Sequence, residues 1–422
     1  MTFQEQNQFL TQRRWRVLAA CCITNFCLGA PYAWSVFAGP LAEHLNALHG
    51  TAMTASDLAL AFSFSSSLTF ITMIAGGYLE KKIGARRIIF AGVILFGIGF
   101  LVCGMARSVL AVIFGFGVIG GLANGLGYVC TVSTAVKFFP DKKGLIGGIS
   151  TASYGISSVI IPPIADALNR SVGISRAFTI FGIAIIGIGG LCSLFILNCP
   201  DDYTPTGWNG GSSGAAGTSR DMTALQMLVS PIFYVMLAMM FIGATIGLMM
   251  ISETAAIAQT MLGMSSSAAA LIVSTYALFN TGSRIVVGWI SDKIGRIRTI
   301  TYVLVLMVLS LLAIYLSGLN GNTFLFRAGI CLIGFSYGSF MGIYPAFTSD
   351  QFGVKYSALN YGILFIGFSL AGVVGPLIMQ KIFSEFGSYR PSFPIAIVFA
   401  LIGIALTFLY RAVNRKLAQK SA

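Results

Sequence analysis

An arginine inside an apolar stretch is the residue with the clearest chemical potential in this chain. Arg284 lies within FNTGSRIVVGWISDKIGR (residues 279–296), eight residues before Asp292. If this segment is helical, Arg284 lies roughly 12 Å inside that charged boundary, at about 1.5 Å per residue. A charge at mid-membrane costs about 2.5–3.5 kcal/mol on translocon scales, so such residues normally face an internal cavity and a partner. The position therefore predicts a binding or pairing role.

Two roles for Arg284 follow from its chemistry. In the structural role, a fixed internal carboxylate neutralises the arginine. One helical turn before it, however, stands the uncharged Asn280, and the acidic residues within the apolar runs are few and near their ends: Asp57, Glu80, Asp166 and Glu253. In the functional role, the planar guanidinium binds a carboxylate substrate through two parallel hydrogen bonds. We favour the functional role and keep the structural one as an alternative.

The composition shows what kind of elements must position this arginine. Of the 422 residues, 56% are hydrophobic and 9% are charged, and the mean hydropathy is +0.85. Soluble proteins carry roughly 25% charged residues, whereas here apolar runs of about 20 residues, long enough to cross a bilayer, recur along the chain. The sequence predicts an all-α polytopic protein in a lipid bilayer. The net charge of +13 follows the membrane boundaries, so it does not indicate nucleic-acid binding.

Breaks in hydropathy divide the chain into twelve predicted transmembrane helices. They cover residues 15–37, 57–79, 86–105, 109–132, 145–168, 175–197, 229–252, 266–291, 298–318, 324–347, 357–382 and 390–411. The first run is too long for a cleaved signal peptide, so we expect a retained span. Residues 198–220 contain NGGSSGAAGTS, the composition of a flexible linker without packing. The distribution of Lys and Arg places both termini in the cytoplasm.

An internal repeat divides these spans into two halves. GYLEKKIGAR begins at Gly77 and GWISDKIGRI begins at Gly288, 211 residues later. We predict two pseudo-symmetric six-helix bundles, residues 1–197 and 229–422, joined by a cytoplasmic linker, 198–228. Such duplication suits an alternating-access carrier with substrate near the midplane, although it does not exclude a channel or a membrane enzyme.

Several motifs resemble those of a known family. The loop from Gly288 to Arg296 is similar to the signature of the major facilitator superfamily, while its first copy departs at Lys81 and Ala85. The segments YAWSVF (32–37), KFFPDKKGL (137–145), FNTGSR (279–284), YPAFTSDQFG (344–353) and SALNYG (357–362) resemble the oxalate/formate antiporter family, which is related to the monocarboxylate transporters. The resemblance covers essentially the whole chain.

This resemblance implies roles for particular residues. Arg284 would bind a carboxylate, and Phe368 stands where the oxalate exchanger has a second cation, a lysine. No Lys or Arg lies between Lys355 and Lys381, and one buried cation balances one negative charge, which favours a monocarboxylate over a dianion. The resemblance also gives aromatic positions that line the site: Tyr32, Tyr128, Tyr154, Tyr337 and Phe365. Gly288, Asp292, Gly295 and Arg296 would form a conformational clamp that packs helix ends together.

Three polar residues of the spans complete the candidate substrate site. Asn124 and Asn280 serve either as cavity ligands or as interhelical hydrogen-bonding groups, and Ser369 lies next to Phe368. The eight cysteines have no metal-ligand spacing. We find no nucleophile–base set and no phosphate-binding loop, so neither a cofactor nor a metal is expected and an enzyme is not predicted.

The sequence therefore predicts a secondary transporter of small carboxylates of the formate, pyruvate or lactate type. It would act by alternating access, as a proton symporter or as an anion exchanger. An oxalate/formate-type dicarboxylate antiporter and an efflux or sensing protein of the same superfamily are the alternatives. We expect a monomer in a bacterial inner membrane.

Overall fold

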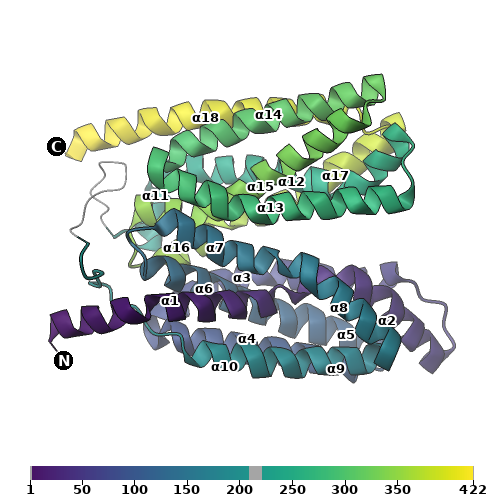
Figure 1. Ribbon diagram of the computed structural model, residues 1–422, viewed down its shortest axis with the longest axis horizontal. Helices are drawn as coiled ribbons and strands as arrows, with labels where there is room; N and C mark the ends of the chain where they lie inside the picture. Colours follow the sequence, from purple (N-terminus) through teal and green to yellow (C-terminus); the bar gives the residue numbers. More distant parts are fainter. Residues whose placement is uncertain (1, 209–220, 422) are drawn as a thin grey trace. The chain divides into compact units, whose positions relative to one another are not determined.

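The computed structural model describes residues 2–208 and 221–421, and these residues form helices without any strand (Figure 1). Twelve of the helical segments are long and apolar enough to cross a membrane. The predicted all-α architecture with twelve spans is therefore confirmed, and the chain is a polytopic membrane protein.

The first six spans include several helices that are interrupted along their length. They comprise α1 (Phe3–Leu28), η1 (Ala30–Ala33) and α2 (Trp34–His49); η2 (Ala55–Leu58) and α3 (Ala59–Ile83); α4 (Ala85–Gly104); α5 (Val109–Val112), the π-helix η3 (Ile113–Gly120) and α6 (Gly121–Lys137); α7 (Lys143–Gly155) and α8 (Ser157–Val172); and α9 (Ile174–Ala184), the π-helix η4 (Ile185–Gly189) and α10 (Gly190–Leu194).

The last six spans are more regular. After the short α11 (Ala224–Val229) they comprise α12 (Pro231–Leu262), α13 (Ser266–Ile294), α14 (Arg296–Asn320), α15 (Thr323–Phe352), α16 (Ser357–Leu364) with α17 (Ile366–Phe386), and α18 (Ser392–Ser421).

The helix α12 continues ten residues beyond the predicted end of its span, at residue 252. The helix stops at Gly263, which adopts the left-handed conformation with φ 62°. Glycine adopts that conformation without steric cost, which is why it is common at the position just after a helix end. Glu253, expected near a helix end, therefore lies well inside α12.

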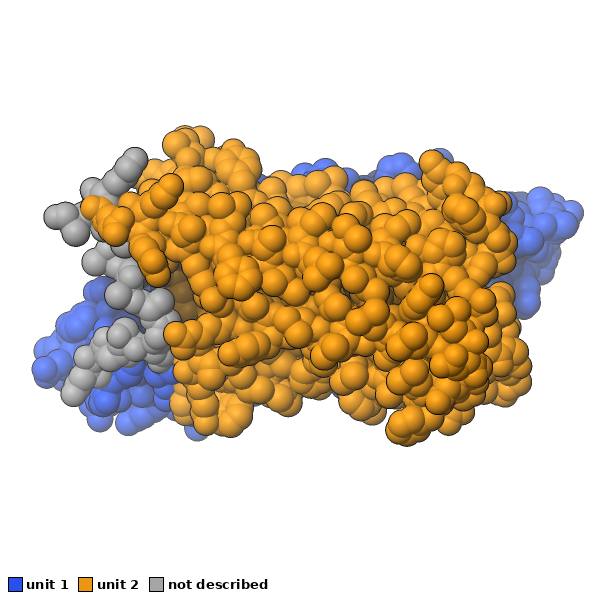
Figure 2. Space-filling model, turned by 90° about the horizontal axis from the view of Figure 1, so that it is seen from above, with its two compact units in different colours: residues 1–141, 149–210, 354–363 blue, residues 142–148, 211–353, 364–422 orange. Residues whose placement is uncertain are grey.

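The chain folds into two compact units (Figure 2). Unit 1 contains residues 1–141, 149–210 and 354–363, and unit 2 contains residues 142–148, 211–353 and 364–422. Residues 142–148 thus belong to unit 2, and residues 354–363 belong to unit 1, opposite to the half of the sequence that contains them. The two short segments are exchanged between the halves.

Residues 198–208 differ from the unpacked linker that their composition predicted. Asp201 forms an ion pair with Lys81 at 2.6 Å, and the Arg86 amide donates to Asn198 Oδ1 at 3.2 Å. The Tyr203 hydroxyl hydrogen-bonds Thr11 Oγ1 at 3.1 Å, and burial raises the pKa of Tyr203. This segment belongs to unit 1 and is packed, whereas residues 209–220 lie outside the described residues. The end of the predicted linker, residues 224–228, is helical and belongs to α11.

Candidate functional site

Arg284 and Asn280 form a hydrogen-bonded pair at the centre of α13. Both side chains are 5% exposed. The guanidinium donates from Nε at 3.3 Å and from Nη2 at 2.9 Å to Asn280 Oδ1. Asn280 lies 14 residues from either end of the helix, so the pair is far from both helix ends. The structure thus places these two predicted site residues together.

The orientation of the Asn280 amide follows from its partner. A guanidinium has only donors, so the amide oxygen must face it and the amide nitrogen must face away. Asn280 Nδ2 is buried and has no hydrogen-bond partner among the residues described by the structure. A buried donor left unsatisfied costs on the order of 1–3 kcal/mol. This turn of α13 is therefore built with a donor that needs an acceptor.

Glycines of α15 hold this turn of α13 in place. A Cβ at Gly338 would collide with the carbonyl oxygen of Asn280, and one at Gly342 would collide with the carbonyl oxygen of Arg284. One turn earlier, Gly334 faces the Tyr276 carbonyl in the same way. Only hydrogen atoms separate the two backbones along three turns, so any larger residue on this face of α15 would push the arginine aside.

Aromatic rings of α15, of α17 and of Phe365, the residue just before α17, form a second group in unit 2. Tyr337 stacks on Phe368 at 6.5 Å between ring centroids, with 10° between the ring planes, and Phe365 contacts Phe368 at 4.6 Å. Tyr337 and Phe365 are buried, while Phe368 and its neighbour Ser369 are half-buried. The structure thus brings together three predicted aromatic residues, and the position of Phe368 is apolar.

The remaining predicted site residues form a group within unit 1. The Tyr154 ring contacts Tyr32 at 5.4 Å and Tyr128 at 4.9 Å. Asn124 Nδ2 donates to the Tyr154 hydroxyl at 3.2 Å and to the Leu28 carbonyl at 2.9 Å. Asn124 therefore has the interhelical role and also touches the tyrosine cluster.

Helix interruptions bring two of these tyrosines into position. Tyr32 lies in η1, where Gly29 and Pro31 interrupt the first span, since proline has no N–H to continue the helical pattern. Tyr154 lies just before the interruption between α7 and α8 at Ile156. Tyr32 is 46% exposed and Tyr128 is 6% exposed, so the cluster reaches from the interior to an accessible surface of its unit.

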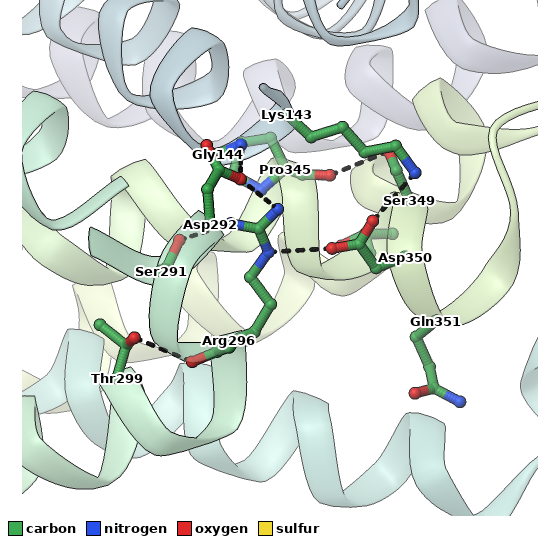
Figure 3. Close-up of polar contacts among 12 residues, drawn as sticks. Lys143, Gly144, Ser291, Asp292, Arg296, Thr299, Pro345, Ser349, Asp350 and Gln351 are labelled. Atoms are coloured by element: carbon green, nitrogen blue, oxygen red, sulfur yellow. Dashed lines mark hydrogen bonds and ion pairs between the residues drawn. The ribbon is translucent and has the colours of Figure 1, made fainter. Parts of the chain in front are cut away.

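Two of the predicted clamp residues, Asp292 and Arg296, lie in one polar network of unit 2 (Figure 3). The Asp292 carboxylate accepts from the amides of Gly144 and Leu145, both at 2.8 Å, and pairs with Arg296 at 2.7 Å. A Cβ at Gly288 would collide with the Gly144 carbonyl. Asp292 therefore satisfies exposed N–H groups at the start of α7, where a negative charge is favourable.

Sequence reasoning missed two members of this network, Lys143 and Asp350. Lys143 and Arg296 both pair with Asp350, each at 2.9 Å. Gly295 ends α13 with φ 90°, which turns the chain toward Arg296. Lys143 belongs to the motif KFFPDKKGL, but its partner is 207 residues away, and no local pattern indicates that pairing.

The first copy of the repeated loop has a different charge arrangement. Glu80 pairs with Lys137 at 2.5 Å, and both side chains are largely buried. Lys81, which stands at the position of the acidic clamp residue Asp292, pairs with Asp201. These groups line a cavity of about 280 Å³ together with Cys199. Burial raises the pKa of the Cys199 thiol to about 12. No group of three His, Cys, Asp or Glu side chains in the described ranges is arranged to hold a metal ion.

Comparison with known proteins identifies the class of this molecule. The model of the Major Facilitator Superfamily matches residues 19–376, and the chain belongs to this superfamily. It is therefore a membrane transporter and not an enzyme. The fold agrees: the superfamily's proton:xylose symporter XylE, bound to 6-bromo-6-deoxy-D-glucose, matches with a TM-score of 0.73 over 94% of this chain and 95% of that one, at 14% identity.

Two relatives are similar over most of their length. The uncharacterized MFS-type transporter YhjX of Escherichia coli (strain K12) is 32% identical over 361 residues, 85% of this chain and 86% of YhjX. The oxalate:formate antiporter of Oxalobacter formigenes is 28% identical over 417 residues, 97% of this chain and 94% of the antiporter. The homologues thus include a carrier of small carboxylates.

Proposed function

We propose that this transporter carries small monocarboxylates by alternating access, as a proton symporter or as an anion exchanger. The observation that carries the proposal is the buried guanidinium of Arg284 at the centre of a membrane helix. Asn280 orients it through two hydrogen bonds without neutralising its charge. A buried cation with a planar set of donors fits a carboxylate.

The aromatic cluster of unit 2 supports a single negative charge on the substrate. Phe368 is stacked on Tyr337 and packed on Phe365, at the position where the resemblance places a lysine in the oxalate exchanger. A dianion would bring a second carboxylate that this apolar group does not balance, and an unbalanced charge in low dielectric is costly. The proposal assigns further substrate contacts to Tyr32, Asn124, Tyr128, Tyr154 and Ser369.

The similarity to the oxalate:formate antiporter supports one other candidate, a dicarboxylate exchanger. Uptake of labelled pyruvate and of labelled oxalate into proteoliposomes decides between the two, with unlabelled acids of one to four carbons as competitors. Repeating the assay with a protonophore separates symport from exchange. Oxalate uptake exceeding pyruvate uptake would replace the monocarboxylate proposal with the dicarboxylate one.

Variants of Arg284 test the role of the guanidinium. Arg284→Lys keeps the charge but loses the planar fork, so we expect transport to fall on the order of tenfold or more at normal membrane expression. Arg284→Ala should abolish carboxylate binding. An Ala variant that still binds carboxylates would instead indicate an efflux or sensing role.

The proposal also includes the setting of the transporter. The distribution of Lys and Arg supports two cytoplasmic termini, and the bacterial relatives support an inner membrane. A monomer suffices for the proposed cycle, because one chain contains both repeats. Size-exclusion chromatography with light scattering measures the oligomeric state.

A further inference from the structure

Glu253 is a carboxylate inside a membrane helix, and the proposed substrate site does not use it. It lies in α12, nine residues before Leu262, the last residue of that helix. This separation is about 14 Å along the helix axis, at about 1.5 Å per residue. Glu253 is half-buried. An ionisable side chain within a membrane helix is costly and usually lies on the path of an ion or a proton. Its position therefore points to a function.

The other carboxylates on the long helices of unit 2 have basic partners. The ion pairs are Asp292–Arg296, Asp350–Arg296, Asp350–Lys143 and Glu385–Lys381, with N···O distances from 2.7 to 3.9 Å. Among the residues that the structure describes, no basic side chain forms an ion pair with Glu253. A fixed counter-charge keeps a carboxylate ionised. Glu253 lacks that constraint and can gain and lose a proton.

Glu253 instead accepts a hydrogen bond from a tyrosine. The Tyr389 hydroxyl, in the turn between α17 and α18, donates to Glu253 Oε2 at 2.9 Å. Tyr389 is 5% exposed, and its ring stacks on Phe383 at 4.5 Å between ring centroids. Burial and the Glu253 carboxylate raise the pKa of Tyr389 to about 12. The phenol therefore keeps its proton and acts as the donor, while the carboxylate is the acceptor.

The charged groups around this hydrogen bond have other partners or lie elsewhere. Arg390, next to Tyr389 in the chain, donates to the Gly318 carbonyl near the end of α14. On α17, Lys381 and Glu385 pair with each other. The charged residue in the first turns of α15, at position 327, is exposed. The helices α13 and α18 contain no charged residue in their first 18 positions.

The helix α12 connects Glu253 to the aromatic part of the candidate site. Gly247 lies six residues before Glu253, or about 9 Å along the helix axis, and a Cβ there would collide with the Tyr337 ring. The Gly247 carbonyl accepts from the Tyr276 hydroxyl at 3.0 Å, and Tyr276 lies one turn before Asn280 in α13. Because no side chain separates α12 from Tyr337, a shift of α12 at Gly247 displaces this ring directly.

Building on the proposed function, we infer that Glu253 carries the proton that crosses with the monocarboxylate, and that Tyr389 positions its carboxylate. With the proposed cytoplasmic termini, the end of α12 nearest to Glu253 faces outward, where the proton enters. Proton binding makes the carboxylate neutral and weakens the hydrogen bond from Tyr389, because bonds to ionised acceptors are roughly twice as strong. One proton and one monocarboxylate anion together move no net charge, and they bind different residues. The transporter is then a symporter.

Two assays in proteoliposomes separate proton coupling from substrate movement. Accumulation of labelled pyruvate under an inward proton gradient measures coupling, and a pH-sensitive dye inside the vesicles reports the entering protons. Counterflow, in which labelled pyruvate outside exchanges for unlabelled pyruvate inside, needs no net proton movement. For the unchanged protein, a gradient of about one pH unit should concentrate pyruvate about tenfold, as one proton per anion requires.

The variant Glu253→Gln assigns the coupling to this residue. The amide resembles the protonated acid but cannot release a proton, so accumulation and acidification should be lost. Counterflow should remain measurable, because the loaded protein can cross in both directions. Glu385→Gln is the matched control, since it makes the same change on a side chain of α17 that is 54% exposed. This control should concentrate pyruvate as the unchanged protein does.

The variant Tyr389→Phe tests the hydrogen bond and keeps the ring that stacks on Phe383. The bond from Tyr389 favours the ionised carboxylate. Without it, the external pH at which pyruvate uptake is half-maximal should rise by about one unit. A pH profile that does not move contradicts the inference that the proton binds at this hydrogen bond. If Glu253→Gln does not fold, this profile decides alone.

The remaining results distinguish this inference from the proposed function. Unchanged protein that performs counterflow but takes in no protons overturns the role of Glu253 and leaves the monocarboxylate proposal in place, with anion exchange as its mechanism. Accumulation that survives in Glu253→Gln also overturns that role. A folded Glu253→Gln protein without counterflow overturns it as well, because the residue is then structural. Unchanged protein without counterflow of any monocarboxylate overturns the proposed function itself.

Discussion

The buried ion pair between Glu80 and Lys137 should make a large contribution to the stability of unit 1. Its atoms are 2.5 Å apart, and the two side chains are 7% and 9% exposed. Glu80→Gln leaves the Lys137 ammonium buried without its counter-charge, and breaking one side of such a pair costs about 3–5 kcal/mol. The adjacent polar cavity of about 280 Å³ is large enough for water, which supports the lower end, about 3 kcal/mol.

A double-mutant cycle measures this contribution. At about 2 °C per kcal/mol for a domain of this size, Glu80→Gln should lower the melting temperature in detergent by about 6 °C, and Lys137→Met should have a similar effect. The double variant should recover most of the loss, because replacing both partners removes the unpaired charge. A double variant at least as unstable as the sum of the single variants would refute the reasoning.

Three further predictions concern close packing, thiol reactivity and the clamp. Gly338→Leu should abolish transport and lower the melting temperature by displacing the turn that carries the site, whereas Gly282→Ala, which meets nothing within 4 Å, should preserve both. Because its pKa is about 12, the Cys199 thiol should contain about a thousandfold less thiolate at pH 7.5 than an ordinary thiol. Mass spectrometry should therefore find slow alkylation of Cys199 in the folded protein, with a rate that rises with pH. After denaturation the alkylation should be fast. Asp292→Ala removes the acceptor of two amides, so hydrogen exchange at residues 144–146 should accelerate on the order of tenfold, and unchanged exchange would contradict the capping role.

The spans and the central arginine could be predicted because each depends on local properties. An apolar run of about 20 residues is a signal in itself, and a lone charge inside such a run stands out, as at Arg284. Helix ends were harder to predict, since the end of α12 is determined by the conformation of Gly263 and not by hydropathy. Hydropathy shows where lipid is, whereas backbone conformation shows where a helix stops.

Contacts between distant segments could not be predicted from the sequence. Residues 198–208 look like a linker by composition, yet Asn198, Asp201 and Tyr203 bind partners in three other parts of unit 1. The pairing of Asp350 with Lys143 is equally non-local. The roles of the individual candidate site residues stay predictions until ligands are measured.

The glycine contacts between α13 and α15 have a consequence for engineering. Because the backbones of α13 and α15 touch along three turns, Arg284 and Tyr337 lie on two closely packed helices. Substitutions at that interface should therefore be strongly destabilising. Phe368 instead lies half-buried on α17, outside that interface. A change of substrate preference should therefore disturb the packing least at this position. We expect Phe368→Lys to add binding of dicarboxylates and to leave Arg284 in place.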